Sequence, residues 1–236
     1  MYTGKVVLIT GTSRGVGRHL AEYFLSKNAK VIGISGSKVQ DGINYRHYAV
    51  NLSMPHEIAG VFTSIKELVS KEGIDICINN AAIMSSRMSQ KMPELDAYQM
   101  IMVDLLAPFL VCREASKLMY DIPYGRIINI GSITDVCEAM GDSVYAACKA
   151  GLKTMTNILA KEYARQNITC NTLAISAIDT DMLAQHKPEV VDALVKTFPI
   201  PRKATIADIT NVIDFFCSEK SGYITAQTIY LGGLHK

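Results

Sequence analysis

The chain has 236 residues, a length typical of one or two domains, and α/β chains of this length commonly form one domain. With 24 Lys and Arg against 22 Asp and Glu, its formal net charge of +2 is too close to zero for the strongly basic surface of a nucleic-acid-binding protein. Hydrophobic residues make up 49% and charged residues 19%, a balance that can bury a core and excludes a disordered chain.

No run approaches the 18 or so consecutive apolar residues that span a bilayer, and the chain leads at once into an apolar, strand-like segment. We therefore expect neither a signal peptide nor a membrane anchor. The six cysteines lack a C-x-x-C pair, which favours a reducing cytoplasm, and the five histidines show no metal-ligand spacing. No metal site is expected.

Short β-branched runs alternate with longer segments of helical periodicity. Strands are expected, in chain order, at Lys5–Thr10, Lys30–Ser35, Tyr45–Val50, Ile74–Asn79, Arg126–Ile130, Ile168–Ile175 and Thr228–Leu231. Helices are expected between them at Gly15–Lys27, Pro55–Lys71, Pro93–Tyr120, Val144–Arg165, Asp181–Thr197 and Ala204–Glu219. This alternation predicts a single α/β domain, residues 1–236, with a doubly wound seven-stranded parallel sheet and helices on both faces.

Three glycines follow the first predicted strand and lead into the first predicted helix. Gly11, Gly15 and Gly17 have the spacing G-x-x-x-G-x-G. Glycines at such a turn allow close approach of the backbone to a pyrophosphate, and the helix N-terminus favours the anion. The position predicts a dinucleotide phosphate site, with an ordinary glycine turn as the alternative.

The residue after the second strand normally reads the adenosine ribose, and an acid there binds the free 2′-hydroxyl. The segment Ile34–Lys38 contains no acid. Arg14 and Lys38 are suited to hold a 2′-phosphate through charge-assisted hydrogen bonds, which favours NADP(H) over NAD(H). The alternative is that Lys38 is an ordinary solvent-exposed loop charge.

Tyr145 and Lys149 lie four residues apart, on one face of a predicted helix. A nearby ammonium stabilises a phenolate and lowers the tyrosine pKa, which suits a proton donor to a carbonyl under reduction. Tyr23 and Lys27 have the same spacing, so position must separate the pairs. Tyr23 lies on the helix leaving the glycine turn, whereas Tyr145 follows the fifth strand, near the edge where parallel sheets bind ligands.

Two further segments end strands at that edge. Ser132 follows the fifth strand, where its hydroxyl either binds a substrate carbonyl oxygen or belongs to an ordinary strand-end turn. Asn80, Ala81 and Ala82 follow the fourth strand, and small residues there let a dinucleotide pass closely.

Together these motifs resemble the compact subclass of the short-chain dehydrogenase/reductase family from Lys5 to Gly233. The resemblance implies a Rossmann fold, with Tyr145 as acid/base, Lys149 binding the nicotinamide ribose and lowering the pKa of Tyr145, and Ser132 orienting the substrate. The residues then expected to line the cofactor site are Gly11, Ser13, Arg14, Gly15, Val16, Gly17, Ser37, Lys38, Asn51, Leu52, Asn80, Ala81, Ala82, Tyr145, Lys149, Ile178 and Thr180.

The chain departs from the family pattern at three places. Asp104 replaces an Asn that carries a proton-relay water, and a carboxylate lacks the amide's donors. We count Asp104 with the catalytic candidates, while a plain acceptor for backbone N–H groups is the alternative. Ile175 and Ser176 replace the usual Pro-Gly, and Asn51 replaces an adenine-contacting Asp.

The pattern indicates an NADP(H)-dependent carbonyl reductase or alcohol dehydrogenase that most resembles 3-oxoacyl-(acyl-carrier-protein) reductases. One alternative is a catalytically impaired regulatory or scaffold protein that binds the cofactor. Another is a sugar-nucleotide epimerase or dehydratase, which the chain length and the glycine spacing disfavour.

The segment 181–202 is expected to cover a small carbonyl or acyl substrate. Its apolar residues are Met182, Leu183, Leu194, Val195 and Phe198, which either form a wall of the site or pack on the core. An acyl chain, a cyclic ketone and a sugar remain open as substrates. The expected helices 93–120 and 144–165 are the family's usual subunit contacts, which implies a homotetramer or homodimer.

Overall fold

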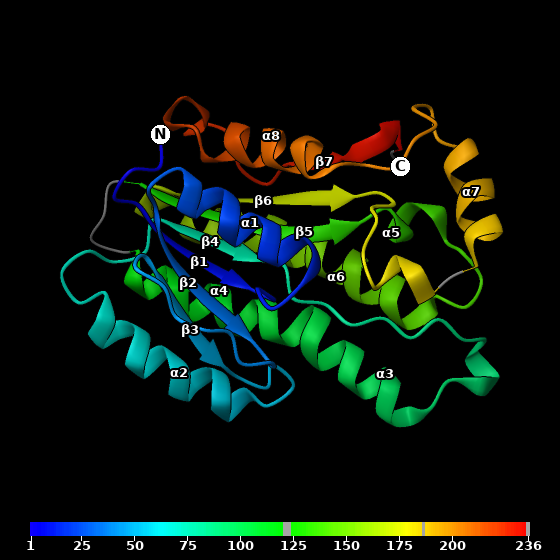
Figure 1. Cartoon of the computed structure of the whole chain (residues 1–236), viewed down its shortest axis with the longest axis horizontal. Helices are drawn as coiled ribbons and strands as arrows, with labels where there is room; N and C mark the ends of the chain where they lie inside the picture. The colour runs from blue at the N-terminus through cyan, green and yellow to red at the C-terminus, as the bar shows by residue number, and fades with distance from the viewer. Residues whose placement is uncertain (120–123, 186, 235–236) are drawn as a thin grey trace.

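A seven-stranded, entirely parallel sheet runs through the molecule in the order β3-β2-β1-β4-β5-β6-β7 (Figure 1). The computed structural model describes residues 1–119, 124–185 and 187–234. The strands are β1 Val6–Thr10, β2 Lys30–Ser35, β3 Tyr45–Ala49, β4 Ile76–Asn79, β5 Gly125–Ser132, β6 Ile168–Ile175 and β7 Thr228–Tyr230. The seven predicted strands and the parallel sheet are thus confirmed.

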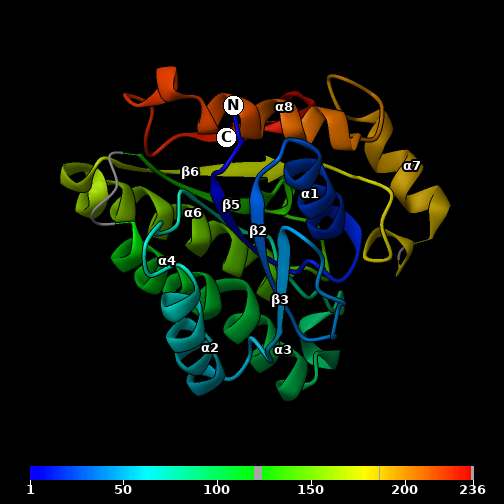
Figure 2. The ribbon, with the colours of Figure 1, turned by 60° about the vertical axis from the view of Figure 1, so that its left-hand side comes forward.

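Helices cover both faces of this sheet (Figure 2). On one face lie α1 (Gly15–Ser26) and α8 (Ile206–Cys217), and on the other α2 (Pro55–Leu68), α4 (Ala107–Leu118) and α6 (Ser143–Tyr163). Each face has its own apolar cluster, with Phe24 and Phe216 in the first and Ile65 and Cys112 in the second. Because both faces are covered, β1 is buried at every residue, as its continuous apolar pattern requires.

The predicted helix over 93–120 is divided in the structure. It comprises α3 (Glu94–Ile101), a π-helical segment η2 (Met102–Leu106) and α4, while Tyr120 lies outside the described residues. Pro108, in the first turn of α4, has no N–H to give to the carbonyl four residues earlier, which belongs to Asp104. The wider, π-helical turn lies directly before this missing hydrogen bond, and it carries Asp104.

The prediction of one helix over Asp181–Thr197 is wrong. The described part of this segment contains a 3-10 turn, η4 (Leu183–Gln185), and a separate helix, α7 (Pro188–Lys196). Pro188 restricts the preceding residue, and Lys187 is accordingly extended at φ −63° and ψ 134°.

Several short elements were not expected from the sequence. They are α5 (Thr134–Cys137) and the 3-10 turns η1 (Ser89–Lys91), η3 (Ala164–Gln166), η5 (Glu219–Ser221) and η6 (Leu231–Gly233).

One helical stretch of the described chain, Glu94–Leu118, is long and apolar enough to cross a membrane by length and composition alone. Its second half, α4, lies against β4 and β5, and Val111, Cys112 and Ala115 are buried there. A helix that packs on the core of a sheet passes the same test of length and composition.

The strand order reverses direction between β1 and β4. The connections that leave these two strands therefore diverge to opposite sides of the sheet and open a crevice beyond their carboxyl ends. The arrowheads of β5 and β6 point to the same edge, the side that carries α7 (Figure 1).

Candidate active site

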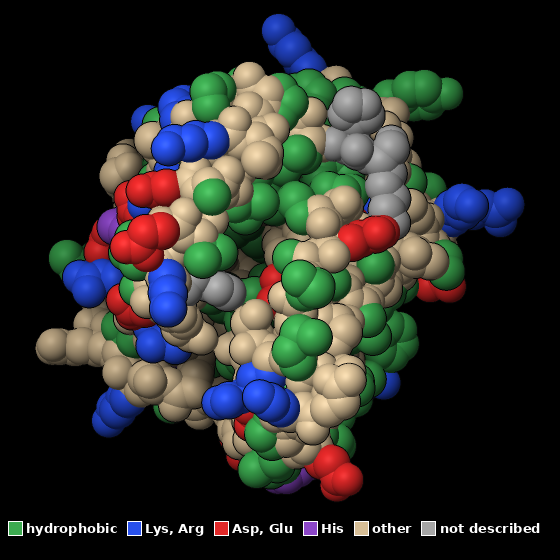
Figure 3. Space-filling view, turned by 90° about the vertical axis from the view of Figure 1, so that its right-hand side faces the viewer, with side chains coloured by type: hydrophobic (Ala, Val, Ile, Leu, Met, Phe, Trp, Pro, Cys, Tyr) green, Lys and Arg blue, Asp and Glu red, His purple; other side chains and the backbone are tan. Residues whose placement is uncertain are grey.

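A cleft of about 1090 Å³ opens at the carboxyl edge of the sheet. Figure 3 looks at this edge and shows the hollow, with mainly hydrophobic and uncharged side chains around it. The segments that follow β1, β2, β4, β5 and β6 line the cleft, together with parts of η4 and α7. The structure therefore brings distant parts of the chain to the edge at which the sequence placed the site.

All but one of the residues predicted to bind the cofactor line this cleft. They are Gly11, Ser13, Arg14, Gly15, Val16, Ser37, Lys38, Asn51, Leu52, Asn80, Ala81, Ala82, Tyr145, Lys149, Ile178 and Thr180. Gly17 does not line it. A Cβ at Gly17 would overlap the carbonyl oxygen of Gly11 and the side chain of Asn80, so this glycine permits close packing of α1 behind the turn.

The glycine turn is tied to the end of β4. The Asn80 and Ala81 backbone N–H groups donate to Thr10 Oγ1 at 3.1 and 3.0 Å, and Asn80 Nδ2 donates to the Thr10 carbonyl at 3.0 Å. Gly11 has φ +79°, and a Cβ there would lie 2.9 Å from Ala81 Cα. Only glycine fits this close crossing of two backbones, which leaves room for a ligand at the switch point.

The far end of the cleft, away from Tyr145, lies at the carboxyl end of β2, where Ser37 and Lys38 are lining residues. The segment 35–39 contains no acidic residue. The Arg14 side chain is 76% exposed and lies 3.8 Å from Asp181. Asn51 Oδ1 accepts hydrogen bonds from the backbone and side chain of Ser53.

Three catalytic candidates lie together at the other end. Ser132 comes from the last residue of β5, and Tyr145 and Lys149 come from the first two turns of α6. The Ser132 hydroxyl accepts from the Thr134 N–H at 3.2 Å and from its Oγ1 at 3.0 Å. Lys149 Nζ donates to the Ile130 carbonyl at 3.1 Å and lies 5.5 Å from the centre of the Tyr145 ring.

The pKa of Tyr145 is raised, not lowered. Burial is the largest cause, the charge of Asp104 acts in the same direction, and a hydrogen bond with Ser132 opposes both. The expectation of a lowered pKa is therefore wrong for this structure, because it considered Lys149 and omitted burial and Asp104. A phenol with a raised pKa stays protonated at neutral pH and is able to donate a proton.

Asp104 does not line the cleft but lies behind it on η2, fully buried. Its Oδ1 accepts the Ile83 backbone N–H at 2.9 Å, whereas Oδ2 has no hydrogen-bond partner among the described residues. Burial raises the pKa of Asp104 to about 6, and the positive charge of Lys149 acts against this rise. Burial in turn lowers the pKa of Lys149, and Asp104 opposes that shift. The two groups thus stabilise each other's charge inside the protein.

The second Tyr-Lys pair lies elsewhere. The Tyr23 hydroxyl donates to Asp214 on α8 at 2.6 Å, and Lys27 Nζ lies 5.6 Å from the centre of the Tyr23 ring. Neither residue lines the cleft. Position in the fold therefore separates two pairs that spacing left equivalent.

The substrate end of the cleft includes Met182, Leu183 and Leu194 from the predicted covering segment. Val195 and Phe198 instead pack in a small apolar cluster with Ile133, Ala177 and Val191, so the alternative that they belong to the core holds for these two.

Sequence reasoning missed a second group of lining residues on the connections after β4 and β5. They are Ile83, Met84, Ser86, Thr134, Ala139, Met140 and Asp142, together with Gln185 of η4. Ile83, Met84 and Thr134 lie within a few residues of a strand end, which was the available signal for these three. Among the residues that the structure describes, no three His, Cys, Asp or Glu side chains form a group that could hold a metal ion.

The fold and the cleft define an oxidoreductase of the Rossmann type, in which a glycine turn at the switch point and a buried Tyr-Lys pair line the same cleft. A family model described as enoyl-(acyl carrier protein) reductase matches residues 11–235. The chain is 34% identical to 3-oxoacyl-(acyl-carrier-protein) reductase FabG of Aquifex aeolicus over 98% of its length and 96% of the relative. It is 36% identical to FabG of Rickettsia conorii, with the same two coverages. The chain therefore belongs to the short-chain dehydrogenase/reductase family and acts on a carbonyl or alcohol group.

Solved structures show the same fold. A short-chain dehydrogenase from Leptospira borgpetersenii with bound NAD+ has a TM-score of 0.88 and 26% identity, covering 98% of this chain and 92% of that one. A putative gluconate dehydrogenase from Agrobacterium tumefaciens has a TM-score of 0.87 and 28% identity, covering 98% and 95%.

Proposed function

We propose that this chain is an NADP(H)-dependent carbonyl reductase in which Tyr145 is the general acid. The observation that carries the proposal is that the buried phenol of Tyr145 shares one cleft with Ser132, Lys149 and the glycine turn. The crossing of Gly11 and Ala81, where a Cβ does not fit, suits a dinucleotide pyrophosphate. The Leptospira relative was solved with NAD+, which supports a nicotinamide cofactor.

The bound nicotinamide supplies the hydride. The Ser132 hydroxyl is placed to donate a hydrogen bond to the substrate carbonyl oxygen and polarise it. Tyr145 delivers its phenolic proton to the same oxygen as negative charge develops there. Lys149 would hold the cofactor ribose, and its ammonium group, 5.5 Å from the centre of the Tyr145 ring, would stabilise the phenolate that remains. Because the phenol is protonated at neutral pH, it can serve as the proton donor that reduction requires.

We propose 3-oxoacyl thioesters as the substrate class, because the curated relatives carry that activity in their names and the substrate end of the cleft is largely apolar. The test measures NADPH oxidation with a 3-oxoacyl thioester and, separately, with the matching trans-2-enoyl thioester. We expect turnover with the first and little with the second. Turnover with the enoyl substrate alone would favour the reaction that the family description names, and NADPH binding without any turnover would favour the regulatory alternative.

The preference for NADP(H) depends on Arg14 and Lys38. We expect Lys38→Ala or Arg14→Ala to weaken NADPH binding about tenfold or more, the value of a charge-assisted hydrogen bond, and to leave NADH nearly unchanged. Lys27→Ala, outside the cleft, is the matched control. Fluorescence titration of both cofactors checks this. Equal losses for NADPH and NADH, or tighter NADH binding by the unmodified protein, would contradict the preference.

The assembly is proposed to be a homotetramer or homodimer through the helical stretch of α3 and α4 and through α6. Ile101, Phe109 and Ile158 are exposed on these helices, and burial between subunits would remove their apolar surface from water. A cytoplasmic location is proposed because all six cysteines are free thiols.

A further inference from the structure

The loop that follows β2 is tied to His47 on the neighbouring strand β3. The Val39 backbone N–H donates to His47 Nδ1 at 3.3 Å, and His47 Nε2 lies 2.8 Å from Ser35 Oγ. Ser35 Oγ in turn donates to the Ser37 carbonyl at 3.0 Å. Both ring nitrogens are therefore occupied by the segment 35–39, which lines the far end of the cleft.

These contacts assign the protons of the ring. A backbone N–H is only a donor, so His47 Nδ1 must be an unprotonated acceptor. Ser35 Oγ gives its own proton to the Ser37 carbonyl and therefore accepts from His47 Nε2–H. His47 is thus neutral, in the Nε2–H tautomer, and no ring N–H is left to bind a ligand directly.

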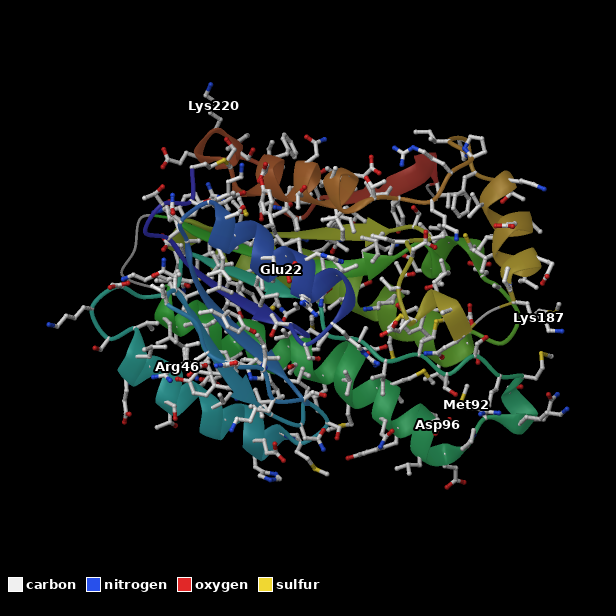
Figure 4. All side chains as sticks on the ribbon, in the orientation of Figure 1. Glu22, Arg46, Met92, Asp96, Lys187 and Lys220 are labelled. Carbon is white, nitrogen blue, oxygen red and sulfur yellow. The ribbon has the colours of Figure 1, made fainter. Side chains whose placement is uncertain are left out.

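The charged groups around His47 leave this assignment intact. Asp41 accepts the His47 backbone N–H at 2.7 Å and is paired with Arg46, which Figure 4 labels on β3. The ring of Tyr45 lies 6.2 Å away between centroids. Burial lowers the pKa of His47, and Asp41 only partly offsets this. The neutral form therefore persists to lower pH than in a solvent-exposed histidine.

We propose that His47 is a positioning residue for the cofactor, which in its neutral Nε2–H tautomer holds the loop that presents Ser37 and Lys38 to the 2′-phosphate. A proton on Nδ1 would face the Val39 N–H, break that hydrogen bond and release the loop. The inference rests on the proposed NADP(H) site. It also makes a prediction opposite to that of a direct phosphate ligand, because an imidazolium that touched the phosphate would tighten NADPH binding on acidification.

The test compares three variants by titrating NADPH and NADH binding between pH 8 and pH 5. His47→Leu removes both hydrogen bonds, and we expect about a tenfold loss of NADPH affinity at pH 8, with a smaller loss for NADH. His47→Asn keeps an acceptor for the Val39 N–H without a titrating ring, so it should retain most of the affinity at pH 8. His56→Ala, an exposed histidine on α2, is the control and should change nothing.

The NADPH phosphate itself titrates near pH 6, so the decisive quantity is the ratio of affinities of the unmodified protein and His47→Asn at each pH. We expect this ratio to fall on acidification, and 15N NMR of the free protein to show the Nε2–H tautomer. A ratio that rises on acidification, a rise of the His47 pKa on NADPH binding, or the Nδ1–H tautomer would overturn the proposal. Equal affinity of the unmodified protein for NADPH and NADH would overturn the cofactor preference and, with it, the role of the loop at the 2′-phosphate. The tautomer of the free protein and the affinity ratio for NADH would then still show whether His47 holds the loop.

Discussion

Tyr145→Phe is expected to lower turnover by about 10² to 10⁴, the usual contribution of a positioned general acid. The change removes only the phenolic hydroxyl, so the fold and the affinity for NADPH should be retained. The raised pKa of Tyr145 makes this hydroxyl a full proton donor at neutral pH, and its loss leaves the developing alkoxide without a proton source. Steady-state kinetics with NADPH and a 3-oxoacyl thioester, with cofactor binding measured in parallel, check this.

Tyr23→Phe is the internal control, because Tyr23 has the same four-residue spacing to a lysine but lies outside the cleft. It should leave turnover unchanged and lower stability by about 1 kcal/mol through the lost hydrogen bond to Asp214. Asp214 keeps its second donor, the Tyr2 hydroxyl, at 2.7 Å. If Tyr23→Phe lowered the turnover of a folded protein more than Tyr145→Phe, the assignment of the catalytic pair would be wrong.

The direction of the Tyr145 pKa shift also predicts two different pH profiles. Reduction needs the protonated phenol, so its rate should stay level through neutral pH. Oxidation of the alcohol product needs the phenolate, so its rate should rise with pH into the alkaline range. An oxidation rate that reaches its plateau near pH 7 would show that the bound state lowers the pKa of Tyr145 below its ordinary value.

Much of the fold follows from local pattern. The strand β1 was predictable because five consecutive residues are apolar or β-branched, as a doubly covered strand requires. Pro188 indicates the break before α7, because a proline disfavours helical geometry in the preceding residue. The helical periodicity of the apolar residues nevertheless predicted one continuous helix. The π-helical turn was not predicted, although Pro108 removes a helical hydrogen bond to the Asp104 carbonyl directly after it.

The sequence predicts which residues form the site, but not the direction in which their pKa values shift. The glycine turn, Ser132 and Tyr145 follow from position after strands, since parallel strands end at one edge. The sign of the Tyr145 pKa shift depends on burial and on Asp104, which comes from η2, 41 residues earlier in the chain. The role of His47 depends on register across β2 and β3. The pKa shift of Tyr145 and the hydrogen bonds of His47 arise from tertiary contacts, which residue spacing in the sequence does not predict.

Asp104→Asn tests the departure from the family pattern. The folded protein raises the pKa of this carboxyl from 3.8 to about 6, so the native state binds the proton more tightly than the unfolded chain does. Stability contributed by this group is therefore full below pH 4 and is lost as pH rises toward 6, by about 3 kcal/mol. We expect the Asn variant to lack this dependence in chemical denaturation at a series of pH values.

The kinetic effect of Asp104→Asn separates catalysis from structure. The amide has no charge to raise the pKa of Tyr145, so the alkaline rise of the oxidation rate should move to lower pH, and any inflection near pH 6 should disappear. Turnover in reduction should be retained or increased, because the amide supplies the donors that a carboxylate lacks. An unchanged profile at an unchanged rate would assign Asp104 to structure alone. A collapse of activity in a folded, cofactor-binding Asn variant would mean instead that Lys149 needs the carboxylate charge to stay protonated, because burial alone lowers its pKa.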